Sequence, residues 1–124
     1  DFSEKNYFPI EAQHKLMKRL FFPEVFSENE RFSISENTLN RIKKYMHSVP
    51  RKSGYKEDEF YDSYGKFFLY GDSKDRIPEQ FKIYNKVGYA YGTLTETAYI
   101  VDEKAGIEFL LTATILVNKN EIFN

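Results

Sequence analysis

The sequence predicts an α+β fold in which helices come first and an antiparallel sheet follows. In the first half of the chain, apolar residues recur at helical spacing, whereas from Phe81 onward they alternate with polar residues at a spacing of two. Short connections that contain glycine separate the apolar segments after Phe81, which is typical of an antiparallel meander. We therefore expect a single partial domain over residues 1–124, with a helical region over 1–76 and a sheet region over 77–124.

Two helices are predicted before residue 50. Pro9 suits the first position of a helix, and the helical spacing continues until Pro23 ends the run. Ser33 and Glu36 form a capping-box pattern, which predicts the start of a second helix that ends before Pro50. The two apolar faces consist of Ile10, Leu16, Met17, Leu20 and Phe21 in the first helix, and of Leu39, Ile42, Tyr45, Met46 and Val49 in the second.

A third, aromatic helix is predicted over residues 60–68. Asp58 is a suitable N-cap for it, and Gly71 is a suitable stop. Charged residues on its N-terminal side and the stretch 71–80 on its C-terminal side are predicted to be loops. The helical period is formed by Phe60, Tyr61, Tyr64, Phe67 and Phe68.

Three strands are predicted in the sheet region. Residues 81–87 alternate between apolar and polar side chains and lead into 88–92, which is predicted to be a turn bracketed by glycines. The segment 93–101 is rich in Thr, Tyr, Ile and Val, and 102–106 has the length of a hairpin loop. Residues 107–117 are apolar on both faces, which is expected of a strand buried from both sides.

The third strand is expected to need a partner along its outer edge, because a bare apolar edge recruits other chains. Either a missing N-terminal part of the same protein or another chain is predicted to pair there. The first residue is Asp1 rather than Met, and residues 118–124 are interpreted as a turn followed by an interrupted segment. These ends indicate a fragment or a processed product.

The composition excludes several classes of function. With 41% hydrophobic residues the chain can form a packed core, and its net charge of −1 argues against binding to nucleic acid. The absence of cysteine excludes disulfides, thiolate metal sites and cysteine nucleophiles, and no apolar run is long enough for a membrane span. His14 and His47 lie on different predicted helices, so we expect neither a metal site nor a cofactor.

The pattern Ser-x-x-Lys, which supplies nucleophile and base in one class of acyl-transfer enzymes, occurs twice. Ser53 with Lys56 lies in a charged loop, and Ser63 with Lys66 lies on the predicted aromatic helix. With 8 Ser and 13 Lys in the chain, roughly one chance match is expected, so two are unremarkable. We interpret both as chance.

A stronger feature is the strand that ends with Lys86 followed two residues later by Gly88. The ammonium supplies positive charge, glycine removes a side chain that would block a ligand, and the next backbone N–H can point at an oxyanion. The alternative is an ordinary strand that ends in a glycine turn, and spacing alone favours this alternative.

The N-K-V-G segment and the two strands after it form a longer pattern over residues 77–118, most specific over 81–117. This pattern resembles the C-terminal part of the serine beta-lactamase-like superfamily, which includes the penicillin-binding proteins. It is most similar to exported, largely uncharacterised beta-lactamase-like hydrolases. Further upstream, similarity to the helical region of these relatives is found in the strings DFSEKNYFPIEAQ, FPEVF and FYDSYGKFFLYGD.

The resemblance implies roles for the residues around Lys86. Lys86 matches the lysine of the family's K-T-G motif, which helps to hold the substrate carboxylate and to tune the serine centre. Gly88 matches the glycine of that motif, and Tyr89 would donate its backbone N–H to the oxyanion hole. Val87 departs from the family's Thr or Ser and lacks the hydroxyl that commonly binds the carboxylate of beta-lactams, which argues against antibiotic hydrolysis in particular.

The family's S-x-x-K and S-D-N motifs lie well upstream of K-T-G, outside this chain, as do the first two strands of its five-stranded sheet. Those strands would cover the third strand predicted here. We therefore expect the C-terminal portion of a serine hydrolase that acts on a small molecule or peptide, exported or periplasmic by resemblance, and inactive alone. The alternative is a non-catalytic domain of the same fold that binds a peptide or protein.

Overall fold

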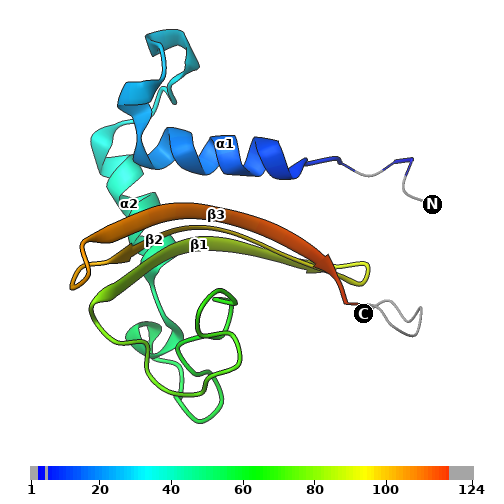
Figure 1. Cartoon of the computed structure of the whole chain (residues 1–124), viewed down its shortest axis with the longest axis vertical. Helices are drawn as coiled ribbons and strands as arrows, with labels where there is room; N and C mark the ends of the chain where they lie inside the picture. The colour runs from blue at the N-terminus through cyan, green and yellow to red at the C-terminus, as the bar shows by residue number, and fades with distance from the viewer. Residues whose placement is uncertain (1–2, 5, 118–124) are drawn as a thin grey trace.

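The computed structural model describes residues 3–4 and 6–117, and within them two α-helices precede a three-stranded antiparallel sheet, as predicted (Figure 1). The predicted turn over 118–124 lies outside the described residues. The helices are α1 (Ile10–Phe21) and α2 (Glu36–His47), with short 3-10 helices η1 (Pro23–Val25), η2 (Glu28–Glu30) and η3 (Pro50–Ser53). The strands, in their order across the sheet, are β1 (Phe81–Ala90), β2 (Thr93–Asp102) and β3 (Ile107–Leu116).

Different segments of the chain pack on the two faces of the sheet (Figure 1). Helix α1 packs on β2 and β3, and α2 packs on β1. The opposite face is covered by residues 54–80, which contain no helix or strand. We call the face with the side chains of Tyr84, Lys86, Thr97, Tyr99 and Thr112 the helix face, and the face with those of Ile83, Asn85, Glu96, Ala98 and Ile100 the loop face.

On the helix face, Met17 and Leu20 of α1 are buried against the sheet, as the helical spacing predicts. Pro9 is the N-cap of α1 rather than its first residue. The start predicted for α2 is two residues too early, because its N-cap is Ser35 and not Ser33. The Ser35 hydroxyl accepts a hydrogen bond from the Thr38 N–H at 3.2 Å, which satisfies one of the open donors of the first turn.

On the loop face, the predicted aromatic helix over 60–68 is wrong. The chain makes successive turns there, with positive φ at Gly65 and at Leu69. The N–H groups of Phe67 and Phe68 donate to the Glu96 carboxylate at 2.9 and 2.7 Å, whereas a helix would require them to bond to carbonyls one turn earlier. Phe68, Tyr70 and Phe81 pack around a core formed by Ile77, Ile83, Ala98 and Ile100.

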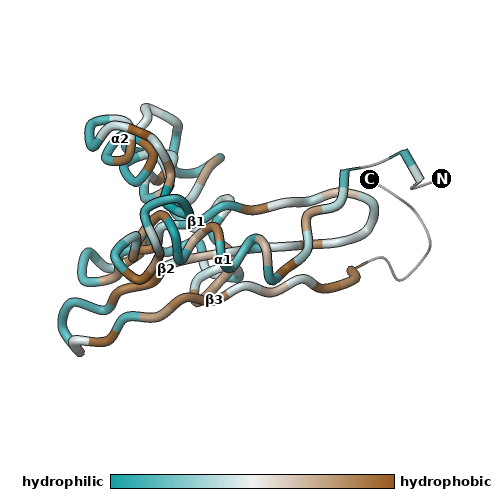
Figure 2. Tube along the Cα trace, turned by 90° about the horizontal axis from the view of Figure 1, so that it is seen from above, coloured by the Kyte–Doolittle hydropathy of each residue, from teal (hydrophilic) through white to brown (hydrophobic). Residues whose placement is uncertain are grey.

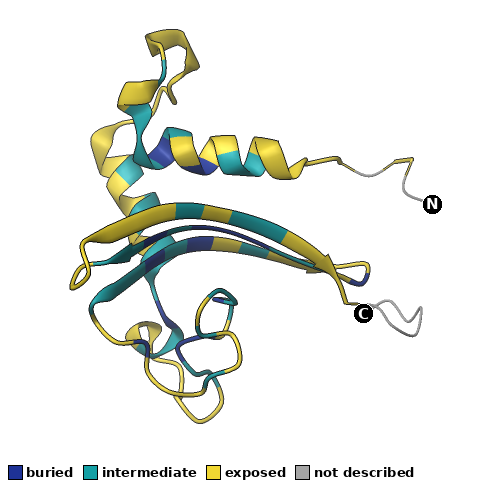
Figure 3. Ribbon diagram, viewed as in Figure 1, coloured by how far each residue is buried: buried dark blue, intermediate teal, exposed yellow. Residues whose placement is uncertain are grey.

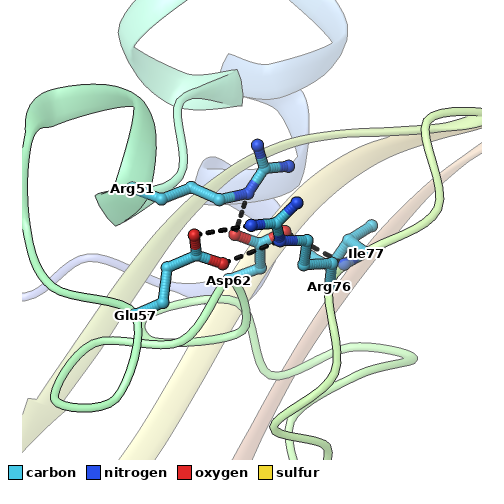
Figure 4. Close-up of polar contacts among 5 residues, drawn as sticks. All are labelled: Arg51, Glu57, Asp62, Arg76 and Ile77. Carbon is cyan, nitrogen blue, oxygen red and sulfur yellow. Dashed lines mark hydrogen bonds and ion pairs between the residues drawn. The ribbon is translucent and has the colours of Figure 1, made fainter.

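Two arginine–carboxylate pairs, one buried and one exposed, involve the segment that covers the loop face (Figure 4). The buried Asp62 carboxylate accepts from the Arg51 Nε at 2.7 Å and from the Ile77 N–H at 3.0 Å, so it joins η3 to the segment just before β1. Arg76 forms two hydrogen bonds of 2.7 Å with Glu57, and both of these side chains are exposed.

The turn between β1 and β2 is shorter than predicted. Strand β1 continues to Ala90, so Gly88 lies inside the strand, and only Tyr91 and Gly92 form the turn. Their φ angles are 52° and 74°, as a two-residue primed hairpin turn requires.

Strand β3 is not buried from both sides. It is an edge strand of the described sheet, and its apolar side chains are largely open to solvent (Figures 2 and 3). Ile107 is 55% exposed, Ile115 56% and Leu116 74%. Residues 54–80 cover the loop face over the core of β1 and β2, and Ala113 and Ile115 of β3 line an open pocket next to Phe68 and Leu69.

Candidate functional site

The residues predicted to form a site lie together in the second half of β1. Lys86 pairs with Thr97 of β2, and Gly88 pairs with Thr95. The side chain of Lys86 lies on the helix face, because it follows Tyr84 at a spacing of two and Tyr84 contacts Phe21 of α1.

Every second residue of this segment directs its backbone N–H and carbonyl groups away from β2. The Ile83 carbonyl accepts a hydrogen bond from the Lys66 ammonium at 2.9 Å, so it points outward from the sheet. Since opposed residues in an antiparallel pair alternate between bonded and non-bonded positions, the backbone groups of Val87 and Tyr89 point to the same outer edge. The Tyr89 N–H therefore points away from β2, toward the outer edge of β1.

A groove of about 730 Å³ lies between the two helices and this end of the sheet. One wall is apolar and comes from α1 and α2, and threonines of β2 lie opposite it. A volume of this size, with mainly apolar walls, is typical of small-molecule sites. The lining consists of Asn6, Phe8, Gln13, Leu16, Met17, Leu20, Ile42, Met46, Lys86, Val87, Gly88, Tyr89, Ala90, Thr93, Thr95 and Thr97.

Lys86 is the one cationic side chain among the described residues that line the groove. Its ammonium donates to the Val87 carbonyl at 2.8 Å, and within residues 3–4 and 6–117 no carboxylate lies within ion-pair distance of it. A methyl group added to Gly88 would meet only the Thr95 Cβ, at 3.9 Å. Within the described residues, a side chain added at Gly88 would therefore meet no close contact, and the Lys86 ammonium beside it has no ion-pair partner.

Sequence reasoning missed a buried polar cluster on the loop face. The Lys66 ammonium donates to the Met46 and Ile83 carbonyls, both at 2.9 Å, and to the Asn85 Oδ1 at 2.7 Å. The Asn85 amide donates in turn to Glu96 at 2.5 Å. Asn85 and Glu96 occupy inward positions of alternating strands, and polar residues at such positions need buried partners. That signal was available in the sequence.

Burial dominates the electrostatics of this cluster. It lowers the pKa of Lys66 to about 8, although the negative charges of Glu96 and Asp62 oppose the change. Burial also raises the pKa of Glu96, and the hydrogen bonds from Phe68, Asn85 and Phe67 partly offset this effect. The cluster therefore contains a lysine and a carboxyl group whose charged forms are both disfavoured by their surroundings.

The two Ser-x-x-Lys matches do not form nucleophile and base pairs. The Ser63 hydroxyl donates to the Ser73 carbonyl at 2.6 Å, while Lys66 is occupied by the contacts given above. Lys56 pairs with Glu59 at 3.2 Å. Their interpretation as chance matches agrees with these contacts.

Comparison of the chain with protein-family models, curated proteins and solved structures found no match. In the described part of the chain, no helix is long and apolar enough to cross a membrane. The same residues contain no group of three side chains suited to holding a metal ion. His14 instead hydrogen-bonds to Thr112 at 3.1 Å, and the ring of His47 packs on that of Tyr84.

Proposed function

We propose that this chain forms one wall of the acyl-transfer site of a beta-lactamase-like serine hydrolase, exported or periplasmic, whose serine lies in another part of the same protein. The observation that supports this most is the placement of Lys86 and the Tyr89 N–H on an outer strand beside a groove. In this proposal the ammonium binds a substrate carboxylate, and the Tyr89 N–H stabilises the oxyanion.

In the proposed reaction the serine oxygen bonds to the substrate carbonyl carbon, and its proton passes to a neighbouring base. The bond between the acyl carbon and the leaving group then breaks, and the leaving group takes up the proton. Water hydrolyses the acyl-serine in a second step. Because Val87 supplies no hydroxyl at the position of the family's Thr or Ser, we propose a substrate other than a beta-lactam antibiotic.

The test is labelling of the longest protein whose reading frame contains this chain, with an acylating serine probe. We expect stoichiometric labelling, and we expect Lys86→Ala to slow it by about a hundredfold, as loss of a charge-stabilising group does. Lys82→Ala is the matched control, because Lys82 lies on the same face of β1 but does not line the groove. An unlabelled parent protein, or unchanged labelling after Lys86→Ala, contradicts the proposal.

A second candidate function is a non-catalytic domain of the same fold that binds a peptide or protein. The departure at Val87 and the exposed apolar edge of β3 favour it. Binding without any labelling of the parent protein would support this candidate over the hydrolase.

We also propose that an upstream part of the same protein pairs along β3. The Val117 N–H donates to the Gly92 carbonyl at 2.7 Å, so by the alternation of an antiparallel pair the backbone groups of Leu110, Thr112 and Thr114 point outward. Hydrogen exchange tests this pairing. The amides of these three residues should be protected in the longer protein and exchange rapidly in the 124-residue chain, and equal exchange in both excludes it.

A further inference from the structure

The last turn of α2 contains a carbonyl group that the helix itself cannot satisfy. Helix α2 covers Glu36–His47, so the helical donor for the Met46 carbonyl would be the N–H of residue 50. That residue is Pro50, which has no N–H. The Lys66 ammonium donates to this carbonyl instead, at 2.9 Å. A cation is favourable at this end of a helix, because the last carbonyl groups carry a partial negative charge.

The same ammonium also binds the outer edge of β1. The Ile83 carbonyl, which points away from β2, accepts from it at 2.9 Å, and the side chain of Asn85 on the same strand accepts at 2.7 Å. An ammonium has three N–H donors, so these two acceptors and the Met46 carbonyl use all of them. Lys66 is only 3% exposed, and it therefore joins the end of α2 to β1 from a buried position.

Both of the elements that Lys66 joins line the groove. Ile42 and Met46 of α2 belong to its apolar wall, and β1 lines it from Lys86 to Ala90. Lys66 itself is not among the described residues that line the groove. The distance between α2 and β1, and with it the width of the groove, therefore depends on a residue outside the lining.

Charged groups from several elements face Lys66. Burial lowers its pKa to about 8, against the opposing effect of the negative charges of Glu96 on β2 and Asp62 in the segment 54–80. On α2, burial lowers the pKa of His47, and the positive charge of Lys66 adds to this effect. Strand β1 contributes the neutral amide of Asn85. Lys66 therefore loses its proton at a lower pH than an ordinary lysine does.

We propose that Lys66 is a protonation-dependent joint between α2 and β1 that sets the width of the groove. A neutral amine has two N–H donors, so one of the three acceptors loses its donor when the proton leaves. Ile83 and Asn85 are held in place by their pairing with β2, whereas Met46 belongs to a separate element. The contact with Met46 is therefore the one that loosens. The inference goes beyond the proposed function, because it concerns the shape of the groove and not a reaction in it.

The experiment is a pH titration of the ¹³C- and ¹⁵N-labelled 124-residue chain by NMR, between about pH 6 and pH 10. We expect the Lys66 Nζ signal and the Met46 carbonyl signal to change with one common midpoint of about 8. The methyl signals of Ile42 and Met46 should follow the same midpoint. Those of Leu16 and Leu20 on α1 are the internal control, because they line the same groove without a hydrogen bond to Lys66.

Two variants complete the design. Lys66→Met removes the titrating group and keeps most of the side-chain volume, so the α2 methyl signals should no longer change near pH 8. This variant also separates Lys66 from the α-amino group of the chain, which titrates in the same range. Lys74→Met removes an exposed lysine of the same segment and should leave the midpoint unchanged. If Lys66→Met does not fold, the comparison of the Lys66 Nζ signal with the methyl signals in the wild type decides.

The proposal is overturned if the α2 methyl signals do not follow the Lys66 Nζ signal, or if the α1 methyl signals change equally. It is also overturned if the change persists in folded Lys66→Met. A titrating Lys66 without a response in the groove would mean that the residue only stabilises the fold. Labelling of the longer protein tests the proposed reaction separately, so failure of the joint and failure of the hydrolase are distinguishable.

Discussion

Helices α1 and α2 on one face of the sheet and residues 54–80 on the other are bound to it by different kinds of interaction. On the helix face, α1 and α2 contribute apolar and aromatic side chains, and the tilted rings of Phe21 and Tyr99 are 4.5 Å apart between their centroids. On the loop face, residues 54–80 contribute an apolar core next to buried charged groups. Regular helices satisfy their own backbone, so their contacts with the sheet are made by side chains alone. An irregular segment must find partners for its backbone groups elsewhere, and here Glu96 of the sheet supplies them.

Lys66→Met should have the largest effect on stability. The substitution keeps most of the side-chain volume but leaves the carbonyls of Met46 and Ile83 and the Asn85 amide oxygen without their donor. We expect a loss of about 4 kcal/mol in the free energy of unfolding, measured by urea denaturation. Lys74→Met, in the same segment but exposed, is the control and should change it by less than about 0.5 kcal/mol. Equal effects of the two substitutions would show that the cluster does not hold the loop.

Met17→Ala tests the packing of α1 on the helix face of the sheet. Met17 is 1% exposed between α1 and the sheet, so truncation leaves a cavity in an apolar interface. We expect a loss of about 3 kcal/mol in the free energy of unfolding. Leu16→Ala, at a neighbouring position of the same helix that is 36% exposed, should cost far less. If Met17→Ala costs no more than Leu16→Ala, α1 is not packed on the sheet as described.

The contributions of Lys66 and Met17 to stability should also differ in their pH dependence. The pKa of Lys66 is about 8 in the folded chain, against 10.5 for an unperturbed lysine, so between these values the unfolded chain binds more protons. Stability therefore rises with pH in this window, by about 2 kcal/mol between pH 8 and pH 10 from this group. The comparison is between the wild type and Lys66→Met. The free-energy cost of the substitution should grow across the window, whereas the cost of Met17→Ala should stay constant. A constant cost for Lys66→Met would contradict the lowered pKa.

The smallest expected difference in stability is between loss of one and loss of the other of the two arginine–carboxylate pairs near the loop face (Figure 4). Arg51→Met leaves the buried Asp62 carboxylate with only the Ile77 N–H, and it should cost about 2 kcal/mol of unfolding free energy. Arg76→Met breaks an exposed pair and should leave the urea midpoint unchanged within error. If the two substitutions have equal effects, burial does not decide the strength of these pairs.

The local sequence determined the elements whose side chains follow one clear period. Both helices and all three strands were predicted close to their observed bounds, because apolar spacing, Pro9, Pro23 and the glycine turns act locally. The placement of Lys86 and Gly88 on an outer strand was also predictable, since the order of a meander makes its first strand an edge. Their position beside a groove of the helix face was not predicted.

Contacts between distant segments decided the conformation of residues 60–68 and the position of the groove. Residues 60–68 have a helical aromatic period, yet their backbone bonds to Glu96, which follows about thirty residues later. The groove depends in the same way on how α1 and α2 cross the sheet. By itself the sequence determined the order of helices and strands, because short-range spacing sets secondary structure. Only the tertiary structure decided which polar groups share the loop face and that Lys86 lies beside an apolar wall with no ion-pair partner among the described residues, because burial and hydrogen-bond partners depend on residues far apart in the chain.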